Sequence, residues 1–145
     1  MAEADGEPVA AIVGPSAAMH ARDRAAALLG YEVLSSSPGA AVVRMTVGED
    51  MLNGLDVCHG GIVFTLADSA MAHASNGHGV AAVAVAASID FVSPGRAGTT
   101  LTAEAVERDR RGRTALYDVT VTDDGGELVA RFHGRTQQRG SPKPA

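Results

Sequence analysis

The chain has 145 residues, of which 46% are hydrophobic and 20% are charged, a balance typical of one globular domain. Its 17 acidic side chains outnumber 12 basic ones, which argues against a protein whose main partner is nucleic acid or an anionic membrane. No apolar run reaches the length of about 18 residues that a membrane span requires, because Asp68 and Asp90 interrupt the longest candidates.

The single cysteine, Cys58, excludes an intramolecular disulfide, and the first residues carry acids where a secretory leader carries basic residues. Both features predict a cytoplasmic protein. Residues 1–15 and 139–145 are expected to be flexible tails, since they have too few apolar side chains to offset the entropy of ordering. Residues 16–138 are predicted to form one domain.

Residues 17–29 consist mostly of good helix formers and are predicted to form a short helix, with Ser16 as its N-cap and Gly30 just beyond its end. The segment 39–47 alternates well enough to be a strand. Residues 61–76 contain no helix breaker and end at an Asn-Gly pair, so they are predicted to form a longer helix.

Four strand-like segments follow this helix. They cover residues 80–92, 99–109, 114–123 and 127–136, and turn-forming residues separate each from the next. A long helix followed by antiparallel strands indicates an α+β fold, in which the helix fills the concave face of the sheet.

Asp68 lies inside the long helix, whose apolar side chains surround nearly the whole axis, as in a helix that is buried on most sides. An ionised carboxylate that is out of water and unpaired is strongly disfavoured, so it needs a partner, a raised pKa or a function. Asp68 is therefore either a structural acid that bonds a neighbouring strand or turn, or a catalytic group.

Gly60 and Gly61 stand at the start of this helix, where backbone N–H groups are unpaired and lie at the positive end of the helix dipole. Without Cβ atoms they let a ligand approach, so they form either an oxyanion hole or only a tight loop. Gly60 and Asp68 are about 12 Å apart along a helix, too far to act on one carbonyl. Two antiparallel copies of the helix across a two-fold axis would bring them together.

The spacing of Asn53, the His59-Gly60-Gly61 triplet and Asp68, followed by IDFVSPG at residues 89–95, resembles the hotdog-fold acyl-CoA thioesterases of the phenylacetyl-CoA (PaaI) type. The resemblance implies a central helix wrapped by an antiparallel sheet of five or six strands, after a short N-terminal helix. It also implies a homodimer with two shared active sites, paired into a tetramer, that hydrolyses acyl-CoA without a cofactor or metal.

The family's functional positions correspond to Asn53, His59, Gly60 and Asp68. The resemblance implies that Gly60 N–H binds the oxyanion, with Gly61 beside it at the substrate, and that His59 and Asn53 shape the loop. Asp68 of the partner subunit would then act as general base or as nucleophile, two mechanisms that the sequence does not separate.

Phenylacetyl-CoA or hydroxyphenylacetyl-CoA is the expected substrate. Met71 and His73 stand where relatives commonly carry aromatic residues, and Ser93 where they commonly carry a basic one, so the acyl pocket and part of the CoA contact are expected to differ. The arginine-rich turn at residues 108–113 is either a solvated hairpin tip or a phosphate-binding group. Its preferred contacts to coenzyme A are Arg111 and Arg113.

Two other functions remain as alternatives. A hotdog enoyl-CoA hydratase would use an Asp and a His five residues apart, as Asp68 and His73 are, although such residues point about 140° apart on a regular helix. A non-catalytic acyl-CoA-binding module is the second.

A zinc site is not predicted, because no second cysteine and no acid at ligand spacing accompany the histidines. Cys58 is expected to be a packed residue.

Overall fold

The computed structural model describes residues 15–140, and the predicted tails at residues 1–14 and 141–145 lie outside that range. The described elements are the helices α1 (Pro15–Ala21), α2 (Arg24–Leu29) and α3 (Gly60–Asn76), the 3-10 turn η1 (Glu49–Met51), and the strands β1 (Glu32–Ser37), β2 (Ala40–Thr46), β3 (Ala82–Phe91), β4 (Thr100–Arg111), β5 (Thr114–Thr122) and β6 (Leu128–Gln138). None of these helices is long and apolar enough to cross a membrane.

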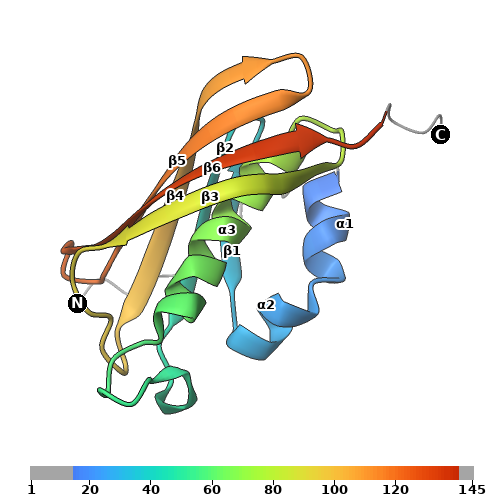
Figure 1. Cartoon of the computed structure of the whole chain (residues 1–145). Coiled ribbons are helices and arrows are strands. Elements are labelled where there is room, and N and C mark those ends of the chain that lie inside the picture. The colour runs from blue at the N-terminus through green and yellow to red at the C-terminus, as the bar shows by residue number, and fades with distance from the viewer. Residues whose placement is uncertain (1–14, 141–145) are drawn as a thin grey trace.

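The six strands form one antiparallel sheet in the order β1-β2-β4-β5-β6-β3. The sheet curves around α3, which contacts every strand, while α1 and α2 lie to one side (Figure 1). The predicted α+β architecture, with one long helix against the concave face of the sheet, is therefore confirmed. β3 and β1 form the two edges of the sheet.

The hydrophobic core lies between α3 and the sheet. The helix contributes five side chains that are fully buried, namely Leu66, Ala67, Ala70, Met71 and Ala74. Phe64 packs edge-on against Phe132 of β6, with ring centroids 5.2 Å apart. A Cβ atom at Gly134 would lie 2.2 Å from the sulfur of Met71, so the missing side chain lets the helix approach the sheet.

The prediction of one helix over residues 17–29 is wrong, because the chain bends between α1 and α2. Asp23 starts the second helix, because its side chain accepts a hydrogen bond from the backbone N–H of Ala26 and caps α2. Ser16 lies within α1, and its hydroxyl bonds His73 instead of capping the helix. Gly30 ends α2 with a left-handed φ of 72°, as predicted.

The helix α3 is also less enclosed than its apolar composition predicted. One stripe along it is only partly buried among residues 15–140, and we call Gly61, Thr65, Asp68 and Ala72 the open stripe. The spacing of three and four residues places these side chains on one face, which points away from the sheet. Strand β1, which the residue pattern alone did not predict, completes the sheet at six strands.

Candidate active site

The start of α3 is organised by His59. This residue is the N-cap of the helix, and its Nδ1 accepts a hydrogen bond of 2.9 Å from Gly61 N–H. Gly60 is the first helical residue, and its N–H has no hydrogen-bond partner within residues 15–140. The two predicted donors therefore differ: the cap uses Gly61 N–H, whereas Gly60 N–H is free at the positive end of the helix dipole.

Asn53 holds the loop before this helix. Its Oδ1 accepts hydrogen bonds from the N–H groups of Leu55 and Val57, at 2.9 and 3.3 Å. The backbone of Asn53 also bonds Val57, which closes the turn. Asn53 thus shapes the loop, and the Nδ2 group of its amide has no partner in the part of the chain that the structure describes.

A cavity of about 420 Å³ brings Asn53 and Gly60 together with the segment after β3, Val92 to Gly95. Its other walls are mainly apolar. The ring of Phe91 packs on Gly60, since a Cβ atom there would lie 3.0 Å from the ring. Sequence reasoning did not single out Phe91, although it belongs to the IDF segment of the family motif. A free N–H donor in an apolar cavity suits a carbonyl oxygen that gains negative charge during a reaction.

Asp68 lies in the open stripe, outside this cavity. It receives no hydrogen bond and forms no ion pair among residues 15–140, and burial raises the pKa of its carboxyl group. A structural acid would be expected to bond a neighbouring strand or turn, and no such bond is present in these residues. One chain keeps Asp68 and Gly60 apart, because both lie on the same straight helix.

Arg111 and Arg113 flank the tip of the hairpin between β4 and β5. Arg113 lines a small crevice with Ser75 and His78, at the end of α3 opposite to Gly60. Arg111 pairs with Asp109 at 3.0 Å. A single chain therefore does not bring these arginines to the Gly60 cavity.

His73 belongs to a buried network at the far end of α3. Its Nδ1 lies 2.6 Å from the hydroxyl of Ser16, and its carbonyl accepts a hydrogen bond from Ser36. Burial lowers the pKa of His73 to about 4, so its ring is neutral at pH 7. His73 is thus bonded to α1. The hydratase alternative would instead need His73 to act together with Asp68.

The other two departures from the family, Met71 and Ser93, are occupied within the fold. Met71 packs in the core, and Ser93 donates to the carbonyl of Leu128.

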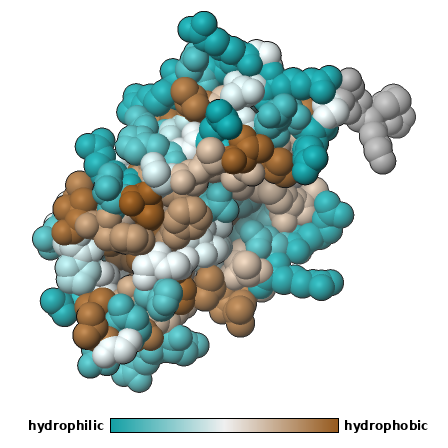
Figure 2. Space-filling model, viewed as in Figure 1, coloured by the Kyte–Doolittle hydropathy of each residue, from teal (hydrophilic) through white to brown (hydrophobic). Residues whose placement is uncertain are grey.

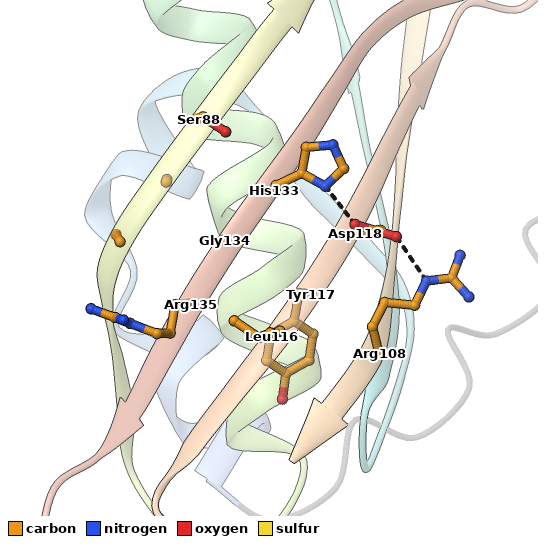
Figure 3. A pocket seen from close by; sticks show the side chains of 10 residues that line it. Ser88, Arg108, Leu116, Tyr117, Asp118, His133, Gly134 and Arg135 are labelled. Carbon is orange, nitrogen blue, oxygen red and sulfur yellow. Dashed lines mark hydrogen bonds and ion pairs between the residues drawn. The ribbon is translucent and has the colours of Figure 1, made fainter. Parts of the chain in front are cut away.

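Another cavity, of about 590 Å³, lies elsewhere, on the outer face of the sheet (Figure 3). There His133 bonds Asp118, which also pairs with Arg108. Burial raises the pKa of Asp118, but the hydrogen bonds from these two residues outweigh it and hold that pKa below its usual range. Ser88 is opposite His133 in register, yet no hydrogen bond joins them, so the cavity has no activated nucleophile.

Two other sequence expectations concern cysteine and metal. Cys58 is buried, and burial raises the pKa of its thiol, as fits a packed residue. Within residues 15–140, no group of three or more His, Cys, Asp or Glu side chains is placed to hold a metal ion.

Comparisons with known proteins identify the family to which this fold belongs. Residues 55–130 match the family model described as the thioesterase superfamily. Acyl-coenzyme A thioesterase PaaI of Escherichia coli is 46% identical over 123 residues, covering 85% of this chain and 88% of that protein. The solved E. coli PaaI structure, from the phenylacetic acid degradation operon, has a TM-score of 0.86 at 45% identity and covers 88% of this chain and 92% of its own. The protein smu.793 of Streptococcus mutans, solved bound to acetyl CoA, has a TM-score of 0.74 at 29% identity, with coverages of 78% and 91%.

Proposed function

The chain belongs to the thioesterase superfamily and is an acyl-CoA thioesterase, and we propose that it hydrolyses phenylacetyl-CoA or hydroxyphenylacetyl-CoA at sites shared by two protomers. One observation carries the proposal. Within residues 15–140, Gly60 N–H is free in an apolar cavity, while Asp68 on the same helix is half-buried and unpaired. The two groups complement each other only when they come from different chains.

Strand β3 supports a dimer. It lies at the edge of the sheet, pairs only with β6, and has ten residues, AVAVAASIDF, of which one is charged. Natural proteins seldom leave so long and apolar an edge unpaired. Apolar surface gathers over β3 in Figure 2, and its large exposed side chains are Val83, Val85, Phe91 and, just beyond the strand, Val92.

Antiparallel pairing of β3 with β3 of a second copy would continue the sheet across a two-fold axis. The two α3 helices would then lie side by side and antiparallel, with the open stripe of each available to the other. This supports a site in which Asp68 of one protomer acts beside Gly60 of its partner. We further propose that two such dimers form a tetramer.

The proposed chemistry begins with the thioester carbonyl in the Gly60 cavity, its oxygen accepting from Gly60 N–H. Asp68 takes a proton from a water molecule, which attacks the carbonyl carbon. The tetrahedral oxyanion then collapses, the C–S bond breaks, and the CoA thiolate takes the proton from Asp68. An oxyanion contact of this type contributes about 10² to 10³ in rate, and a raised pKa makes Asp68 a stronger base.

A second route remains within the same geometry. The carboxylate of Asp68 attacks the carbonyl carbon itself and expels the thiolate, and water then hydrolyses the mixed anhydride. In both routes His59 keeps the first turn of α3 oriented through Gly61, and Asn53 holds the loop with its Nδ2 group available to the substrate.

Arg111 and Arg113 are proposed to contact the phosphates of coenzyme A. Arg113 lines a crevice near the C-terminal end of its own α3, and Arg111 is on the same hairpin. In an antiparallel pair, this end of α3 is next to the N-terminal end of the partner's α3. The protomer that supplies Asp68 would therefore also supply the arginines. The alternative is a solvated hairpin tip, and substitution of both arginines by alanine distinguishes the two through KM.

The proposed function is tested by following free thiol release from phenylacetyl-, hydroxyphenylacetyl-, short-chain and medium-chain acyl-CoA. The aryl esters are expected to react fastest, and the Asp68→Asn protein sets the background. If no ester releases thiol above that background, the proposal is wrong. Sedimentation velocity measures the assembly, and an active monomer would contradict the shared site.

Mixing tests the shared site directly. Asp68→Asn and Gly60→Pro proteins are each expected to be inactive, but subunit exchange gives mixed dimers with one intact site. Random exchange makes about half of the dimers mixed, so roughly a quarter of wild-type activity should return. A mixture that stays inactive, with exchange shown by mass spectrometry, would mean that both groups act within one chain or that Asp68 is structural.

A further inference from the structure

The cavity on the outer face of the sheet takes no part in the catalytic scheme above, and two rows of side chains line it. The first row crosses β5, β6 and β3 and is polar, consisting of Asp118, His133 and Ser88. The second row lies two residues away on each strand and consists of Leu116, Arg135 and Ala86. Strand β3 contributes only small side chains to both rows, so the face is hollow beside β6.

The charges of the polar row are already paired. Asp118 accepts a hydrogen bond from His133 and forms an ion pair with Arg108, whose Nε lies 2.8 Å from the carboxylate. In Figure 3 both side chains turn towards Asp118. These three groups therefore hold one another in place and leave Arg108 largely neutralised.

Arg135 differs from Arg108 in this respect. Among residues 15–140 its side chain forms neither an ion pair nor a hydrogen bond. Figure 3 shows it extending from β6 across β3, away from Asp118. Its neighbours in register on both sides are apolar, and one of them, Leu116, is 46% exposed. An unpaired guanidinium between apolar neighbours suits an anion that carries an apolar group.

The charge of the lining limits that anion to a single negative charge. Arg108 and Arg135 contribute two positive charges and Asp118 contributes one negative charge, which leaves one positive charge when His133 is counted as neutral. A phosphate dianion would be repelled by the carboxylate of Asp118 and would exceed this charge. A carboxylate matches it and can bind one guanidinium through two parallel hydrogen bonds.

We propose that this outer cavity binds monocarboxylates with an apolar body, the chemical class of the free acids that acyl-CoA hydrolysis releases. The carboxylate pairs with Arg135, and the apolar body lies over Leu116 and Ala86. The site is distinct from the Gly60 cavity, because the two share no lining residue. Edge-to-edge pairing of β3 in the proposed dimer would leave it open, since paired strands lie in the plane of the sheet and the cavity is on its face.

The test titrates isotope-labelled full-length protein with phenylacetate, octanoate or inorganic phosphate and follows the chemical shifts of the backbone amides. Both acids should shift the amides of Ala87 and Gly134, with a dissociation constant of about 1 mM because the cavity is open. Phosphate should leave these amides unchanged at the same concentrations. An acid that also enters the active site shifts a second set of amides, around Gly60, so the two sites are observed separately.

Two arginine variants test the assigned cation. Arg135→Gln should raise the dissociation constant of both acids at the outer cavity about tenfold, because the charge-assisted hydrogen bonds are lost. Arg131→Gln is the matched control, since Arg131 is exposed on the same strand and the same face but does not line the cavity. It should bind the acids as the wild type does. Both variants should keep wild-type rates of thiol release.

Several outcomes would overturn the inference. Shifts that are confined to the amides around Gly60 would do so, and so would equal weakening by the two arginine variants, which would indicate only a general attraction of anions. Phosphate that binds as tightly as phenylacetate would overturn the assigned class of ligand. If Arg135→Gln fails to fold, Leu116→Asn takes its place and should also weaken both acids. Absence of thiol release from every ester would overturn the proposed function and leave this site unaffected.

Discussion

The two halves of α3 differ in whether their polar groups have hydrogen-bond partners. In the second half, His73 bonds Ser16, and the amide of Asn76 bonds both backbone groups of Ala82. In the first half, Gly60 N–H and the carboxylate of Asp68 have no partner among residues 15–140.

The difference separates structural from functional polar groups on one helix. A buried polar group that forms hydrogen bonds within the chain stabilises the fold. A buried polar group without a hydrogen-bond partner lowers the stability of the fold, so it is expected to serve another role. Substitutions of Gly60 and Asp68 should therefore change activity and spare stability. Substitutions of His73 and Asn76 should do the reverse.

The largest expected effect is that of Asp68→Asn. Turnover should fall by about 10³ or more, because the base or nucleophile is lost. The melting temperature should stay the same or rise at pH 7. Burial raises the folded pKa of Asp68, so its ionised form destabilises the fold above the unfolded pKa of about 3.9 and not below it. Calorimetry at pH 7 measures this, and a large loss of stability would mean that Asp68 is structural.

A comparison of Gly60→Pro with Gly60→Ala isolates the oxyanion donor. Both variants add a Cβ atom against the ring of Phe91, but only proline removes the N–H. Proline is well tolerated at the first helical position, so the fold should survive. We expect kcat to be lower in Gly60→Pro than in Gly60→Ala by about 10² to 10³. Equal rates in the two variants would remove Gly60 N–H from the mechanism.

Asn76→Ala tests the second half of the helix. The change leaves the N–H and carbonyl of Ala82 without their side-chain partner, next to the start of β3. Unfolding in urea should show a loss of about 2 kcal/mol, with kcat within about twofold of the wild type. A larger fall in kcat at full stability would show that the two halves are not separate in function.

His73 is expected to make the stability of the fold depend on pH. Its folded pKa of about 4 is below the ordinary value of 6.5, so between these values the unfolded chain binds the additional proton. Stability should therefore rise with pH across that window, by at most about 1.4 kcal/mol per pH unit. Urea midpoints of wild type and His73→Gln between pH 4.5 and 7 measure it. Parallel curves for the two proteins would exclude His73 as the cause.

Local patterns predicted most of the fold. Alternation and turn residues located β2 to β6, and the absence of breakers between Gly60 and the Asn76-Gly77 pair located α3. The bend before α2 was missed because alanine-rich helix formers continue through it, although Asp23 is a recognisable N-cap. Strand β1 was missed because its three serines interrupt the apolar alternation.

The site was predictable only in part, because motif spacing shows what lies close along the chain. The motif located Asn53, Gly60 and Asp68, and the helix rise showed that one chain cannot unite the last two. It did not show which N–H the cap of His59 uses, since that depends on a side-chain rotamer. The contact of Phe91 with Gly60 joins distant segments, so only the folded chain reveals it.

The unpaired edge of β3 has a consequence for how much enzyme a cell must make. With the proposed pairing, a newly synthesised chain is inactive until it meets another, so activity at low expression rises with the square of protein concentration and becomes linear once dimers dominate. Before that encounter the apolar edge is exposed and can pair with the wrong strand. Slow synthesis would therefore leave chains inactive for longer.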